Sequence, residues 1–221
     1  HVPAALWRLT QEKELGGSEV VYATVANTLS RLVEKIRSVR VERDEVRRAL
    51  RFMLQDRAGL ELPASSLSDG TMRFVALAVL EMDPSQKGVI CLEEPENGIH
   101  PQRVPAILDL LYRIAVDTEQ CVGISNPLRQ VIITTHSPLV AAKISEGDLL
   151  FAQNANYLIA GVRSMGVEYL GLPNTWRTKA GTASMSRGKV ISYLRGTSVI
   201  PVVLKGPSVA DSVGEQMPLL F

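Results

Sequence analysis

Two adjacent carboxylates, Glu93 and Glu94, follow the apolar run VICL and precede a Pro-Glu-Asn-Gly turn. If VICL is a strand of a parallel sheet, the two acids reach its carboxyl edge, where ligands gather. Successive side chains on a strand point to opposite sides, so the acids would face different partners. One could face a metal ion and the other a reacting water. Taken alone, the pair fits two solvated acids at a strand end better.

Two further segments carry groups that could bind an anion. The loop SLSDGT, residues 66–71, runs directly into an apolar helix. There Ser68 can cap the helix, Gly70 lets a ligand approach the backbone, and the first helical amides favour negative charge. A second apolar run, VIITT, leads to His136, which could donate to a phosphate oxygen or orient a water. Taken alone, the loop SLSDGT is more typical of an ordinary helix cap, and His136 is more typical of a structural histidine.

The apolar patterns predict the elements that must position these groups. Residues 72–82 are apolar almost all round, which is typical of a buried helix, and residues 101–116 are apolar on one helical face. VICL and VIITT are short and β-branched, which is typical of central parallel strands covered on both faces. The order helix, strand, helix, strand, helix predicts an α/β crossover fold.

The flanking regions give other signals. Residues 19–36 have helical spacing. Alternation in residues 38–42 and again in residues 50–54 predicts strands and a hairpin, with a turn at residues 56–59. Beyond residue 151 there are short strand-like pieces, NYLIAGV and SVIPVVL. A run of arginines in the hairpin region could contact phosphate, but interleaved acids favour a solvated face. These arginines are Arg37, Arg40, Arg43, Arg47, Arg48 and Arg51.

Composition limits the partners and the compartment. Lys+Arg 24 against Asp+Glu 23 gives a net charge of +1, so no overall field favours nucleic acid or membrane. The two cysteines, Cys91 and Cys121, match no metal-ligand spacing and indicate a reducing compartment, so we expect a cytoplasmic protein. No apolar run is long enough for a membrane span, and we expect no membrane partner. Because the chain starts at His1, we expect a fragment or a processed piece.

The chain resembles the C-terminal lobe of an ABC-type ATPase in the order of its motifs and elements. That order is LSDGT, a helix, VICLEE, PENGIHP, a second helix and VIITTHS. The likeness is to the RecF/SMC-like group of AAA family ATPases and covers about residues 60–150. It implies an α/β fold, the P-loop NTPase ABC-type head, with a parallel sheet flanked by helices and a peripheral β-hairpin region. It also implies three parts: a peripheral helix and hairpin, the ATPase lobe, and an extension of unknown role. Their ranges are residues 1–60, 61–152 and 153–221.

The resemblance implies ATP and Mg²⁺ as cofactors and a role for each motif. Glu93 is similar to the Walker B acid near Mg²⁺, Glu94 to the general base that polarises water, and His136 to the switch histidine. Residues 95–99 resemble the D-loop that meets its mate across a dimer, with Asn97 and Gly98 as its contact residues. The signature motif, which binds the γ-phosphate of a nucleotide held by a second subunit, is implied for Leu67, Ser68, Asp69, Gly70 and Thr71.

Three features depart from the wider ABC pattern. Asp69 replaces a commoner glycine, although Arg73 could compensate for its charge, and Glu93 replaces a commoner aspartate. No G-x-x-x-x-G-K-[ST] is present, and the nearest imitation, ASMSRGKV at residues 183–190, lacks the first glycine and the hydroxyl after lysine. We therefore expect the Walker A loop on an N-terminal lobe outside these residues.

The sequence thus predicts an ATPase head that dimerises around ATP, as a homodimer, in DNA repair or maintenance or in anti-phage defence. DNA and an effector protein are further candidate partners. One alternative is a non-hydrolysing switch that binds ATP to control assembly. Another is a metal-dependent TOPRIM nuclease appended after the ATPase. The scatter of the late carboxylates argues against that nuclease; they are Glu168, Asp211 and Glu215.

Overall fold

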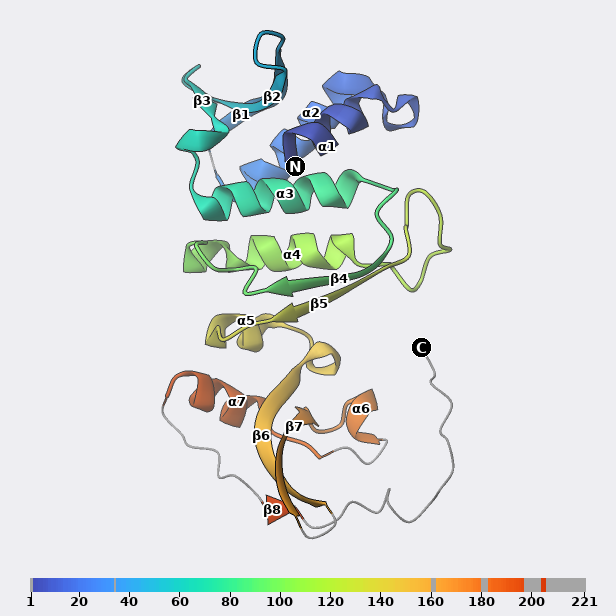
Figure 1. Ribbon diagram of the computed structural model, residues 1–221, viewed down its shortest axis with the longest axis vertical. Coiled ribbons are helices and arrows are strands. Elements are labelled where there is room, and N and C mark those ends of the chain that lie inside the picture. Colours follow the sequence, from blue (N-terminus) through green and yellow to red (C-terminus); the bar gives the residue numbers. More distant parts are fainter. Residues whose placement is uncertain (1, 34, 160–161, 180–182, 197–203, 206–221) are drawn as a thin grey trace. The chain divides into compact units, whose positions relative to one another are not determined.

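The computed structural model describes residues 2–33, 35–159, 162–179, 183–196 and 204–205 (Figure 1). The chain divides into two compact units, one ending at His136 and the other starting at Ser137. Each unit is described by itself below. The three-part division expected from the sequence stays a prediction.

The first unit begins with two helices and a small antiparallel sheet with the strand order β1-β2-β3 (Figure 1). Helices α1 and α2 pack on each other and on this sheet. The predicted hairpin is confirmed, but the predicted helix over residues 19–36 ends at Ser30, and Ile36 begins a strand. The elements are α1 (Val2–Gln11), a 3₁₀ turn (Lys13–Leu15), α2 (Gly17–Ser30), β1 (Ile36–Asp44), β2 (Ala49–Asp56) and β3 (Glu61–Pro63).

Four arginines of this region, Arg40, Arg43, Arg47 and Arg51, are paired with neighbouring acids. Arg40 bonds both Glu42, at 2.6 Å, and Glu61, at 2.7 Å. Arg51 lies 2.8 Å from Asp44. Such exposed pairs contribute little stability, but they leave these arginines with carboxylate partners. The solvated-face interpretation fits this arrangement better than a phosphate-contacting stripe.

The rest of the first unit has the predicted helix and strand order. Helix α3 packs on α4, and α4 packs on β5. Strands β4 and β5 pair in parallel, with Glu93 opposite Thr134. The predicted buried helix begins at Asp69 rather than residue 72, and the helix predicted from residue 101 starts as a 3₁₀ turn. The bounds are α3 (Asp69–Met82), β4 (Gly88–Glu93), the 3₁₀ turn (Pro101–Arg103), α4 (Val104–Ile114) and β5 (Arg129–Thr134).

The β4–β5 sheet is covered on one face only, which corrects the expectation of strands buried on both faces. Alternate side chains along both strands are exposed, among them Val89 at 60% and Ile132 at 48%. Their neighbours Ile90 and Ile133 are half-buried. Two strands alone, with helices on one side, leave the other face of a parallel sheet in solvent, which is unusual for this sheet type.

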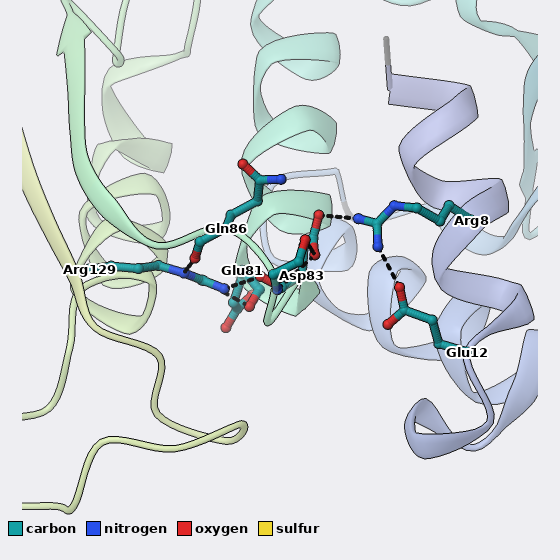
Figure 2. A network of polar contacts seen from close by, with 7 residues as sticks. Arg8, Glu12, Glu81, Asp83, Gln86 and Arg129 are labelled. Atoms are coloured by element: carbon teal, nitrogen blue, oxygen red, sulfur yellow. Dashed lines mark hydrogen bonds and ion pairs between the residues drawn. The ribbon is translucent and has the colours of Figure 1, made fainter.

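A buried arginine joins the start of β5 to the end of α3 and to the segment that leads into β4 (Figure 2). Arg129, the first residue of β5, is 1% exposed. Its guanidinium donates to the carbonyl oxygens of Gln86 at 2.7 Å, Glu81 at 3.2 Å, and Asp83. The Asp83 carboxylate in turn pairs with Arg8 of α1. Carbonyl groups at the end of α3 thus gain a charged donor, as is common at helix C-termini.

The second unit contains a long β6–β7 hairpin, with β8 parallel to β6, and helices α5 and α7 packed together. In the ASMSRGKV segment, Ser186 caps α7 and Lys189 lies in its first turn. Most of the predicted strand SVIPVVL lies outside the described residues, although its last residue begins β8. Among the described residues, no helix is long and apolar enough to cross a membrane. The bounds are α5 (Pro138–Lys143), β6 (Leu150–Ile159), β7 (Val162–Gly171), α6 (Trp176–Lys179), α7 (Arg187–Leu194) and β8 (Leu204–Lys205).

Candidate functional site

The carboxyl edge of the β4–β5 sheet gathers three of the predicted site residues. β4 ends at Glu93, and the backbone amide of Glu94 donates to the Thr134 carbonyl at 2.8 Å, so the pairing continues one residue past the strand. His136 follows two residues later on the neighbouring chain segment. Glu93 and His136 are exposed, and Glu94 is half-buried. Parallel pairing therefore brings both acids and the histidine to one edge, as the motif order predicts.

The loop after β4 folds back on Glu94. The Glu94 carbonyl accepts from the Asn97 amide at 2.9 Å, and the Asn97 side chain donates to the Glu94 carboxylate at 3.4 Å. Glu94 has a φ of 42°, in the left-handed region that non-glycine residues seldom adopt. Gly98, with a φ of 79°, closes the turn. The loop of residues 95–99 therefore helps to set the direction of the Glu94 side chain.

The loop before α3 is a capped helix start. Ser68 accepts a hydrogen bond from the Thr71 amide at 3.2 Å, and the two hydroxyl oxygens lie 2.9 Å apart. The predicted N-cap is thus confirmed. Asp69 is exposed in the first turn. Arg73 directs its guanidinium to the Glu94 carbonyl at 2.6 Å, so its hydrogen bond goes to that peptide, whereas the sequence suggested compensation of Asp69.

The loops before α3 and after β4 touch each other. A Cβ placed on Gly70 would lie 2.3 Å from the Gly98 carbonyl oxygen and 2.7 Å from its carbonyl carbon. Real Cβ atoms do not approach backbone so closely, so only glycine fits at position 70. The predicted site residues at 67–71, 93–98 and 136 therefore belong to one connected set of loops.

Two polar residues of the site were not singled out from the sequence: Thr135 after β5 and Glu96 in the loop after β4. The Thr135 hydroxyl donates to one carboxylate oxygen of Glu96. The second oxygen, Glu96 Oε2, is buried and has no hydrogen-bond partner among the described residues. The Thr135–Glu96 contact joins the loop after β4 to the residue before His136. The available signal was a carboxylate inside a turn and a threonine at a strand end, which becomes informative only once the two strands are paired.

The donor set at the sheet edge fits a magnesium ion that is shared with phosphate. Mg²⁺ is usually held by one or two carboxylates, with water and substrate phosphates completing its shell. In the described part of the chain, the Glu93 carboxylate takes part in no hydrogen bond or ion pair and is exposed. The same residues contain no cluster of three or more His, Cys, Asp or Glu that could hold a metal by itself. Glu93 could thus contribute one ligand.

Comparisons with known proteins agree with this geometry. A family model described as "AAA domain, putative AbiEii toxin, Type IV TA system" matches residues 18–142. The energy-coupling factor transporter ATP-binding protein EcfA2 of Halalkalibacterium halodurans is 32% identical over 105 residues, which are 47% of this chain and 33% of that protein. The match thus spans about a third of this relative's length. Because the family model covers more than half of the chain and includes every loop of the site, the chain belongs to this family of AAA domains.

Proposed function

We propose that this chain is the C-terminal lobe of an ABC-type ATPase head that binds ATP with Mg²⁺ and hydrolyses the nucleotide within a dimer of heads. The observation that carries the proposal is the meeting of residues 67–71, 93–98 and 134–136 at one edge of the β4–β5 sheet. The name of the relative EcfA2, an ATP-binding protein, supports ATP as the ligand.

The proposed roles follow from the needs of phosphoryl transfer, which requires an aligned water, a metal ion and donors around the phosphate oxygens. Glu93 would hold Mg²⁺, which neutralises charge on the phosphates when bound. Glu94 would orient the attacking water and accept its proton. His136 would donate to a γ-phosphate oxygen. These three side chains come from the same edge of the β4–β5 sheet.

The loop before α3 would act on a nucleotide held by a second head. Ser68 and the first amides of α3 offer donors at the positive end of the helix dipole, which favours an anion. Asn97 and Gly98 would meet the partner head beside this loop. Within one chain, Gly98 already lies against Gly70 of the loop. We therefore propose a homodimer that closes around ATP.

A Walker A lobe from elsewhere would complete the head. The exposed face of β4 and β5 carries apolar side chains, including Val89 and Ile132. Parallel sheets are normally covered on both faces, so this face suits a covering lobe. We propose that this lobe also supplies the phosphate-binding loop that the sequence does not contain.

The wider role that we propose is to drive an effector in DNA repair or maintenance or in anti-phage defence. The RecF/SMC-like resemblance supports the first role, and the toxin named in the family description supports the second. DNA and an effector protein are the partners that these roles require.

The test is Glu94→Gln in the complete protein. Glutamine keeps the size of the side chain but cannot accept the water's proton, so hydrolysis should fall by about 10²–10⁴-fold while ATP binding remains. The variant should then accumulate as an ATP-bound dimer. Steady-state turnover, ATP binding and light scattering measure the three quantities. Wild-type turnover by the variant would show that Glu94 is not the base.

Ser68→Arg in the Glu94→Gln background is the control for the dimer. A bulky cation before α3 should block closure on the partner's phosphate, so the double variant should bind ATP but stay monomeric. If Ser68 were only a helix cap, its loss would cost about 1 kcal/mol of stability without a selective effect on assembly. If the wild-type protein dimerised with ATP but did not hydrolyse it, this result would instead favour the alternative function, a switch that binds ATP to control assembly.

A further inference from the structure

Arg73 lies on the second turn of α3 and reaches the peptide of Glu94. Its guanidinium Nη1 donates to the Glu94 carbonyl oxygen at 2.6 Å. A charged donor forms a stronger hydrogen bond than a neutral one. The acceptor is the peptide of the proposed general base, although Arg73 is 21 residues away in the sequence.

The Glu94 backbone needs such support because its conformation is strained. A φ of 42° is uncommon for glutamate and persists only where the surroundings fix it. Its amide is held by the Thr134 carbonyl at 2.8 Å, and its carbonyl by Asn97 at 2.9 Å and by Arg73. Of these three contacts, the one from Arg73 comes from α3, and the other two come from β5 and from the loop after β4.

Helix α3 also begins with the loop proposed to act on the partner's nucleotide. Gly70, in the first turn, touches Gly98 of the loop after β4. Two contacts therefore join the start of α3 to the segment that orients Glu94, one between glycines and one from the arginine. A displacement of α3 would act on the Glu94 peptide through both.

We infer that Arg73 is a positioning residue: it holds the Glu94 peptide so that the carboxylate points at the water, and it links the loop of residues 67–71 to Glu94 within one chain. This inference rests on the proposed ATP hydrolysis. The planar guanidinium can hold its direction better than a flexible ammonium group, so lysine should replace it only in part.

The experiment compares Arg73→Gln, Arg73→Lys and Arg47→Gln in the complete protein. Arg47 is 71% exposed and pairs with Asp44 only at 3.6 Å, so its variant removes an equal charge away from the site. Misplacement of a catalytic group by about 1 Å can cost about 10²-fold. For Arg73→Gln, we expect kcat to fall by about 10–100-fold, with KM for ATP changed by less than about threefold. Arg73→Lys should recover part of kcat, and Arg47→Gln should leave both parameters unchanged.

Two further readouts separate positioning from general damage. ATP-driven dimerisation in the Glu94→Gln background should be the same with and without Arg73→Gln, because the loop before α3 is intact. Thermal unfolding should show that Arg73→Gln is still folded at the assay temperature. Wild-type kcat in both Arg73 variants, with active wild type, would overturn the inference and leave the proposed function standing. Loss of ATP binding together with kcat would also overturn it, because Arg73 would then act on the nucleotide. A wild type that binds ATP without hydrolysing it would overturn both proposals.

Discussion

Gly70 shows how one missing side chain shapes the site. The helix start and the Gly98 carbonyl approach so closely that a Cβ would meet backbone, which cannot rotate away. A glycine in the first turn of a capped helix suggests a position chosen for its backbone conformation, but Gly70 does not have a positive φ. Its function in the fold is to let two loops touch.

Gly70→Ala should therefore lower the free energy of unfolding. Forcing a methyl group into a packed contact typically costs about 1–3 kcal/mol. Gly123→Ala is the control, because Gly123 has no atom within 4 Å of its Cβ position and no positive φ. It should be neutral or slightly stabilising. Urea denaturation of both variants measures the difference, and equal stability would show that the two loops separate without cost.

At this scale the sequence predicts where the site residues lie better than how they are held. The cap by Ser68 and the edge position of Glu93 and Glu94 follow from local pattern. The contact from Arg73 to the Glu94 carbonyl does not, because it depends on where α3 lies relative to the loop after β4. The Glu96–Thr135 contact likewise requires the pairing of β4 with β5.

At the scale of elements, α3, β4 and β5 are held together at one end by the hydrogen bonds of Arg129 and carry the site at the other end. Arg129 and Asp83 lie at the fixed end, separated from the site by the length of β4, about 20 Å for six residues. Helices α2, α3 and α4 and the hairpin are predictable from apolar spacing. The burial of Arg129 is not, because an arginine at a strand start gives the same pattern whether it is solvated or buried.

The protonation of Asp83 makes this end of the unit pH-dependent. Burial by itself would raise the pKa of Asp83, but hydrogen bonds from Ser85 and the charge of Arg8 outweigh it, so this pKa lies below its usual value. The stability that the ionised group contributes is therefore complete above the unfolded-state pKa of about 3.9 and is lost as the pH falls through the lower folded-state value.

Asp83→Asn should remove this contribution. It leaves Arg8 without its buried partner, so the free energy of unfolding at pH 7 should fall by about 1–3 kcal/mol. The difference from wild type should begin to shrink below about pH 4, where the unfolded state takes up the proton, and should vanish only as the pH falls through the lower folded-state pKa. Asp109→Asn is the control, since Asp109 is 52% exposed and pairs with Arg31 and Arg113 at the surface, and should cost less than about 1 kcal/mol. Chemical denaturation at pH 7 and pH 3 tests both, and a deficit as large at pH 3 as at pH 7 would contradict the account.

At the scale of the whole molecule, the exposed face of the β4–β5 sheet is the feature that local pattern could not reveal. VICL and VIITT have the composition of strands covered on both sides, and in the structure one side is open. The composition of a strand reflects its surroundings in the working protein. Its exposure in this structure reflects only the elements that this chain itself provides. The two agree if another lobe covers this face, as we propose.

Val89→Lys tests that cover. Val89 is 60% exposed in this chain, so a lysine there should change the free energy of unfolding of the chain by less than about 0.5 kcal/mol. In the complete protein, the same lysine would be buried without a partner under the Walker A lobe, and the resulting desolvation cost should weaken ATP binding by at least about tenfold. Val122→Lys makes the same change at a loop residue that is 59% exposed and should leave ATP affinity as it is. Titration of ATP into the three complete proteins compares them, and equal affinity for the Val89 variant and wild type would mean that no lobe covers this face of the sheet.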